Sequence, residues 1–155
     1  MSDCQRIEAA WSQLKGDVKA EDFSPLVKIL DEVNGGSHIL KSNLIKQASD
    51  AAPAMDAKGV YTKELDSDVA GRAIVQQQHG KANTIALEEG GRSETVRLDE
   101  QGNPMLLDIY QNCGNKGFGV MSTLPEGKSS YRTYRLPDGI ELTVDNDKPI
   151  KAKQY

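Results

Sequence analysis

The chain has 155 residues, of which 37% are hydrophobic and 27% charged, so it is long enough for one domain with a buried core. Its formal net charge of −4 at pH 7 argues against nonspecific nucleic-acid binding, in which clustered positive charge dominates the affinity. No apolar run approaches the roughly 18 residues of a membrane span. We therefore expect neither a membrane nor a nucleic acid as the partner.

The two cysteines, Cys4 and Cys113, lie far apart along the chain and form no metal-ligand pair. Residues 1–16 contain no apolar core of the length that a secretory signal requires. We therefore expect a cytoplasmic protein, with export by a signal-independent route as the alternative. Two reduced thiols are favoured over a disulfide, which is the other arrangement open to them.

Residues 1–80 show the spacing of amphipathic helices. Ser2 and Gln5 form a capping-box pattern before a first helix that should end near Gly16, with Trp11 facing inward. Ser24-Pro25 begins a second helix, which stops at the glycines after residue 34. A third helix is predicted from Ser37 and a fourth over residues 66–80, with a short strand conceivable over residues 59–64.

Residues 84–144 alternate between apolar and polar side chains in short segments that end in turns rich in glycine, proline and asparagine. This period of two is typical of strands with one buried face, and the turns about every ten residues indicate hairpins. The segments give an antiparallel meander of about six strands, and residues 150–153 could add one at an edge. The apolar positions are Ile85, Leu87, Val96, Leu98, Met105, Leu107, Ile109, Phe118, Val120, Ile140, Leu142 and Val144.

The predicted fold class is α+β, because helices precede strands with few parallel crossovers available. We expect a single domain over residues 1–155, in which a mainly helical part (1–80, about four helices) packs on an antiparallel sheet (81–155). One face of the sheet would then remain solvated. The side chains expected on that face are those of Arg97, Asp108, Tyr110, Arg132, Tyr134, Glu141 and Thr143 or their neighbours.

Two side chains are candidates for acid–base or nucleophilic chemistry. His79 lies at the end of the fourth predicted helix, just before the meander, where a base could face the sheet. Cys113 lies in a turn with three glycines, where Lys116 or His79 could lower the pKa of its thiol. A surface histidine and an ordinary hairpin turn explain the same residues equally well.

Residues 131–135 place two tyrosines and two arginines on one strand, a composition that could bind phosphate or stack on a base. Helices followed by an antiparallel sheet with such a late strand resemble the small microbial ribonuclease and bacterial toxin fold, in arrangement and in this one strand. The resemblance implies a toxin-type hydrolase or ribonuclease-like enzyme that uses His79, Arg132, Tyr134 and Cys113. This strand has no histidine, and an acidic chain is unusual for a ribonuclease.

The carboxylates follow no metal-binding pattern, and we expect no metal and no cofactor. Without a nucleophile–base motif, the sequence favours a small acidic soluble binding protein, such as an inhibitor, an immunity protein or an adaptor, whose protein partner is basic. The contact residues would come from two acidic turns, with Glu88, Glu89 and Arg92 in one and Asp99 and Glu100 in the other. A second alternative is a small-ligand-binding domain with a pocket lined by Met105, Phe118 and Met121.

Overall fold

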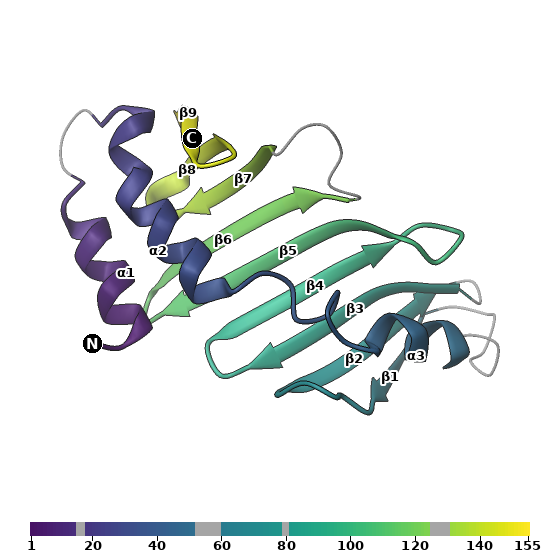
Figure 1. The fold of residues 1–155 in the computed structure, drawn as a ribbon. Helices are drawn as coiled ribbons and strands as arrows, with labels where there is room; N and C mark the ends of the chain where they lie inside the picture. The colour runs from purple at the N-terminus through teal and green to yellow at the C-terminus, as the bar shows by residue number, and fades with distance from the viewer. Residues whose placement is uncertain (15–17, 52–59, 79–80, 125–130) are drawn as a thin grey trace. The chain divides into compact units, whose positions relative to one another are not determined.

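The computed structural model describes residues 1–14, 18–51, 60–78, 81–124 and 131–155. These residues form three α-helices, α1 (Asp3–Ser12), α2 (Ser24–Asn34) and α3 (Leu44–Ala51), and nine strands (Figure 1). The strands pair in chain order from β1 to β9 in an antiparallel sheet. They are β1 (Val60–Leu65), β2 (Arg72–Gln78), β3 (Lys81–Glu89), β4 (Arg92–Leu98), β5 (Pro104–Cys113), β6 (Lys116–Thr123), β7 (Tyr131–Leu136), β8 (Ile140–Asp145) and β9 (Lys148–Gln154).

The prediction of about four helices on a six-strand meander is wrong. The six predicted segments correspond to β3–β8, but β1, β2 and β9 extend the sheet to nine strands. Residues 72–78, predicted as part of a fourth helix, form β2 instead. Their apolar residues fit a helical stripe, yet Ala73 and Val75 also alternate as in a strand, and they pair with Leu87 and Ile85 of β3.

The first helix begins as its capping residues predict, whereas α2 begins at Ser24-Pro25 without a side-chain cap, because Ser24 lies inside the helix and Phe23 precedes it. The Ser2 hydroxyl accepts a hydrogen bond from the backbone N–H of Gln5, and the Gln5 side chain accepts one from the backbone N–H of Ser2. The capping box of α1 is therefore complete. The helix α2 ends at Gly35, which adopts a left-handed conformation with φ of 62°. The third helix is shorter than expected, because residues 37–43 form turns and α3 begins only at Leu44.

The chain divides into two compact units, each of which draws on separate stretches of sequence. The first unit comprises Met1–Gly36, Tyr110–Ser122 and Glu126–Tyr155, and therefore holds α1, α2 and β6–β9. The second comprises Ser37–Ile109 with Thr123–Pro125, and holds α3 and β1–β4 with most of β5.

In the first unit, α1 and α2 pack on one face of the strands β6–β8. Trp11 of α1 meets Phe118 of β6 edge to face, with ring centroids 5.9 Å apart. Tyr134, Leu142 and Val144 are fully buried on the same face. Tyr134 was expected on the solvated face, and that expectation is wrong, because β7 turns Tyr134 and Leu136 inward and leaves Tyr131 and Arg135 exposed.

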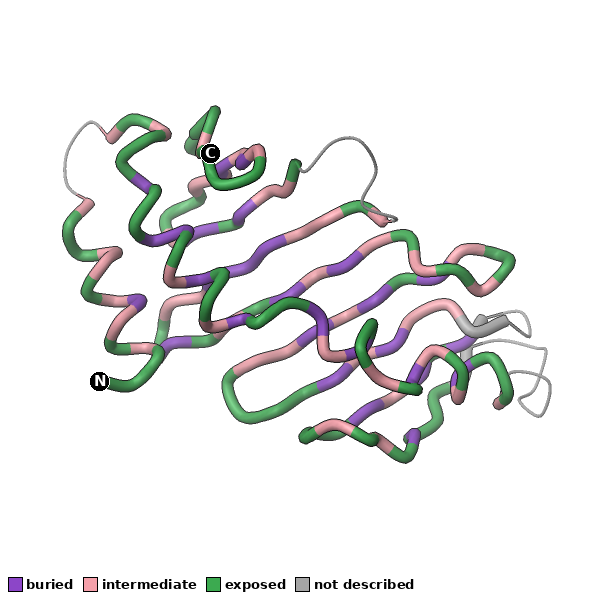
Figure 2. Tube along the Cα trace, viewed as in Figure 1, coloured by how far each residue is buried: buried purple, intermediate pink, exposed green. Residues whose placement is uncertain are grey.

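In the second unit, alternate residues of β2–β4 are buried, and the strands show this alternation along their length (Figure 2). The helix α3 contacts β1 and β3 and buries Leu44 and Ala48. The opposite face of this sheet carries the side chains of Glu64, Arg72, Gln76, Glu88 and Arg97, all exposed. Met105 was expected to be buried but is 42% exposed at the start of β5.

Candidate functional site

The structure brings Arg132 and Tyr134 together with Asp31, a residue of α2 that the sequence did not single out. The Tyr134 hydroxyl donates to Asp31 Oδ1, and Arg132 Nη2 donates to Asp31 Oδ2 at 2.8 Å. Arg132 Nε also donates to the Tyr134 hydroxyl at 2.9 Å. These three side chains, which we call the Asp31 cluster, join the helical layer of the first unit to strand β7.

Burial and mutual charge shift the pKa values within the Asp31 cluster. Burial of the Tyr134 phenol, together with its hydrogen bond to the Asp31 carboxylate, raises the pKa of Tyr134 well above its ordinary value. Burial by itself lowers the pKa of Arg132, but the bonds and charges of Tyr134 and Asp31 outweigh it and raise that pKa. Tyr134 therefore stays protonated and Arg132 stays charged at any physiological pH.

The side chains of the Asp31 cluster bond to one another and to the backbone, so they stabilise the packing of α2 on β7. Tyr134 is fully buried, and Arg132 uses Nε, Nη1 and Nη2 on Tyr134, the Asn146 carbonyl and Asp31. In the sequence, Asp31 looks like any polar residue on the outer face of a helix, so no local signal marks it.

Cys113 is bonded to Cys4 in the structure, so the expectation of two reduced thiols is not met. The Cα atoms of the two cysteines are 5.4 Å apart, within the normal range for a disulfide. The bond joins the start of α1 to the end of β5, across a sequence separation of 109 residues. In this state Cys113 has no thiol to act as a nucleophile.

Of the four residues predicted for an enzyme site, the structure describes three, and it brings two of them, Arg132 and Tyr134, together. Arg132 and Tyr134 are engaged with Asp31, and Cys113 is engaged with Cys4. His79 lies outside the described residues. The ribonuclease-like arrangement of a base, an arginine and a tyrosine around one substrate therefore gains no geometric support from the described residues.

The two acidic turns predicted for partner contact lie at opposite ends of β4. Glu88 and Glu89 are exposed where β3 leads into β4, and Glu100 is exposed in the turn after β4. Asp99 has a structural task in that turn, because its Oδ1 accepts from the backbones of Gln101 at 2.9 Å and Asn103 at 2.8 Å. The two turns are therefore separate patches.

Arg92, which was grouped with the first turn, points into the second unit. Its side chain is only 10% exposed, and its Nη1 donates to Glu94 Oε2 at 3.1 Å. Glu94 is fully buried and also accepts from the Ser37 hydroxyl and from the backbones of His38 at 2.9 Å and Ile39 at 3.1 Å. This buried carboxylate anchors the turn that follows residue 36 to the sheet.

The side chain of His38 adjoins the same cluster, with its Nδ1 atom 3.4 Å from Arg92 Nη1. One feature of the sequence indicates this cluster: Glu94 occupies an inward position in the alternation that continues with Val96 and Leu98. A charge at such a position requires buried partners.

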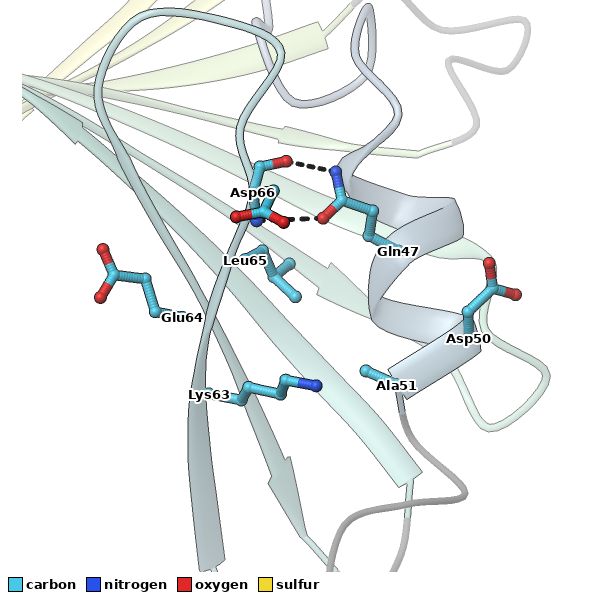
Figure 3. A pocket seen from close by; sticks show the side chains of 7 residues that line it. All are labelled: Gln47, Asp50, Ala51, Lys63, Glu64, Leu65 and Asp66. Carbon is cyan, nitrogen blue, oxygen red and sulfur yellow. Dashed lines mark hydrogen bonds between the residues drawn. The ribbon is translucent and has the colours of Figure 1, made fainter.

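A pocket of about 290 Å³ lies between α3 and β1 in the second unit (Figure 3). Its lining is mostly polar, with Gln47, Asp50 and Ala51 from α3 and Lys63, Glu64, Leu65 and Asp66 from β1 and the residue after it. None of Met105, Phe118 and Met121, the residues predicted for a ligand pocket, lines it.

Among the residues that the structure describes, no group of three or more His, Cys, Asp or Glu side chains is placed to hold a metal ion. Within the same residues, no helix has the length and apolar character needed to cross a membrane. The chain matches no protein-family model, no curated protein and no solved structure.

Proposed function

We propose that this chain is a binding protein that acts by covering a basic protein partner, as an inhibitor, an immunity protein or an adaptor would. The observation that carries the proposal is the pair of exposed carboxylates of Glu88 and Glu89, where β3 leads into β4. An exposed acidic patch speeds association with a basic partner through complementary charge.

The described side chains that were expected to act in catalysis are engaged within the fold, which supports this choice. Arg132 and Tyr134 bond to each other and to Asp31. Arg92, expected at the contact surface, is paired with the buried Glu94 instead. The contact with the partner is therefore assigned to Glu88 and Glu89 at one end of β4, and to Glu100 at the other. Arg92 stabilises the first turn through its buried ion pair with Glu94.

The Cys4–Cys113 disulfide indicates the kind of compartment in which the chain binds its partner. The Cys4–Cys113 bond persists best in an oxidising compartment. We therefore propose that the active form works outside the reducing cytoplasm.

The test is a binding measurement with the partner captured on the tagged wild-type chain from its native host. Neutralising Glu88 and Glu89 to Gln should slow association severalfold, and added salt should slow wild-type association in the same way. Neutralisation is preferred to reversal, because two Glu→Lys changes would bring the formal charge from −4 to zero and invite nonspecific association.

A second variant, Glu100→Gln at the far end of β4, shows whether one turn or both contact the partner. Each variant must keep the wild-type thermal transition, so that lost binding is not lost folding. A host extract that yields no stoichiometric partner, or a partner whose binding ignores both turns and the salt concentration, would refute the proposal.

A further inference from the structure

The Cys4–Cys113 bond joins two positions of the first unit that differ in how firmly the fold holds them. Cys113 is 1% exposed and ends β5, which pairs with β6 in the sheet. Cys4 is partly exposed and lies in the first turn of α1. The bond therefore fastens the start of a helix to the end of a buried strand.

Packing holds α1 less firmly than it holds α2. Of the ten residues of α1, all of which the structure describes, Ile7 alone is buried, whereas four residues of α2 are buried. A helix shorter than about 12 residues is marginal in water by itself, so contacts with the rest of the protein must hold it. The helix α1 has little buried surface with which to make such contacts.

The side-chain contacts of α1 with its neighbours are also exposed. Arg6 Nη2 donates to Glu32 Oε2 of α2 at 2.6 Å, but the two side chains are 37% and 47% exposed. Water screens an ion pair with that exposure, so it contributes little. Trp11 contacts Phe118 of β6 by its ring edge and remains partly exposed. The disulfide is therefore the strongest link between the start of α1 and the sheet.

Reduction of this bond leaves α1 tethered only at its C-terminal end, because Cys4 lies at the other end of the helix. Elements with few buried contacts open at a lower cost in free energy than the whole fold. The neighbouring helix α2 has a separate attachment, since its Asp31 bonds to Arg132 and Tyr134 of β7. The reduced unit can therefore lose α1 and keep α2 on the sheet.

We propose that the Cys4–Cys113 bond is a redox latch, which a dithiol reductant opens at Cys4, and that α1 then leaves the sheet while the rest of the first unit stays folded. The reductant reaches Cys4 in preference to Cys113, because Cys113 is buried. Departure of α1 uncovers the ring of Phe118, which is 2% exposed in the oxidised structure, and the thiol of Cys113.

The chemical step is thiol–disulfide exchange. A thiolate of the reductant attacks Cys4 Sγ, the bond between the cysteines breaks, and Cys113 leaves as a thiolate that takes up a proton. The second thiol of the reductant then attacks the reductant sulfur that is bonded to Cys4, and Cys4 is released as a thiol. Two electrons and two protons have then passed to the cysteines, and the reductant has become a disulfide.

The first experiment uses Trp11, the one tryptophan of the chain, as a reporter of α1. Urea denaturation of the wild type is followed by tryptophan fluorescence and by far-ultraviolet circular dichroism, with and without dithiothreitol. The two transitions should coincide in the oxidised chain, whereas in the reduced chain the fluorescence transition should come at lower urea, because α1 opens before the sheet. The control with both cysteines changed to alanine should show separate transitions in both conditions.

Coincident transitions in the reduced chain, or a loss of all structure on reduction without urea, would overturn the latch. A second measurement uses Cys4→Ala, in which Cys113 is the one remaining thiol. Without urea, iodoacetamide should alkylate Cys113 at more than about one hundredth of its rate in the urea-unfolded chain, because α1 no longer covers it. A slower reaction, as opening by global unfolding alone would give, would also overturn the latch.

This inference goes beyond the proposed function and does not rest on it. Glu88, Glu89 and Glu100 belong to the second unit, whereas α1 and both cysteines belong to the first. Failure of the latch in these experiments would leave the acidic contact with a partner standing, and failure of that contact would leave the latch standing.

Discussion

Tyr134 and Arg132 illustrate how a single partner changes the meaning of a residue. On a bare strand, a tyrosine and an arginine two residues apart look like a surface for phosphate or bases. Once Asp31 of α2 reaches them, the phenol is buried and the guanidinium is shared between three acceptors, including the Asn146 carbonyl. The same two side chains then hold a helix to a sheet.

Replacing Tyr134 with Phe should lower the free energy of unfolding by about 1–3 kcal/mol, because a buried hydrogen bond to a carboxylate is lost while the ring still fills its place. Urea denaturation at pH 7 measures this. Tyr155→Phe is the control, since Tyr155 is 73% exposed, and it should change stability by less than about 0.5 kcal/mol.

The same residue predicts a pH dependence. The folded-state pKa of Tyr134 lies above the unfolded value of about 10. Its contribution to stability is therefore complete below pH 10 and is lost as the pH rises through the folded-state pKa. Tyrosinate absorbance of the folded wild type and of Tyr134→Phe should coincide up to about pH 10.5; an earlier excess in the wild type would contradict the raised pKa.

Glu94 offers a second prediction at this scale. Glu94→Gln keeps the shape of the side chain but leaves the Arg92 guanidinium, 10% exposed, without its carboxylate. Loss of one partner of a buried ion pair costs about 3–5 kcal/mol. The double change Glu94→Gln with Arg92→Met should be less destabilising than the two single changes added together, and strict additivity in urea denaturation would count against the pairing.

At the scale of elements, the sequence located α1, α2 and the strands β3–β8, because caps, turn residues and apolar periods are local signals. It failed at β2, where the apolar residues fit both periods. Partners on either side decided the outcome: Ala73 pairs with Leu65 and Leu87, and Val75 with Ile85. The sequence of a short segment does not indicate which strands will pair with it.

The link between α1 and β5 gives the prediction for this scale. The Cys4–Cys113 bond closes a loop of more than 100 residues, and such a cross-link mainly restricts the unfolded chain. Reduction with dithiothreitol should lower the free energy of unfolding by about 2–4 kcal/mol.

The control for reduction is the variant with both cysteines changed to alanine, whose stability should not respond to reductant. Urea denaturation with and without dithiothreitol measures both proteins. Identical stability of the wild type in the two conditions would contradict the cross-link.

At the scale of the whole molecule, net charge controls how strongly copies of the chain repel one another. The chain carries −4 at pH 7 and has a pI near 5.2. Association of like molecules should therefore be greatest near pH 5 and should fall toward pH 7, as light scattering would show. Neutralising Glu88 and Glu89 should move the maximum to higher pH; scattering that ignores pH between 5 and 8 would contradict this.

Part of the candidate contact surface could be predicted from the sequence. Glu88, Glu89 and Glu100 are exposed, as acidic residues in turns usually are. Arg92 could not be placed, because its inward direction depends on Glu94, and the role of Glu94 depends on Ser37, His38 and Ile39, more than 50 residues earlier. Contacts of that range leave no local trace.

By itself, the sequence determined where the first two helices begin, where most strands lie, and that the chain is acidic, because each of these properties belongs to a few neighbouring residues or to composition. Tertiary structure alone decided that β2 is a strand, that Tyr134 faces inward and that Cys4 meets Cys113. The contacts behind the last two span 103 residues from Asp31 to Tyr134 and 109 between the cysteines. Such contacts exist only once the chain has closed on itself, since periodicity fixes the spacing of a segment but not the partner it meets.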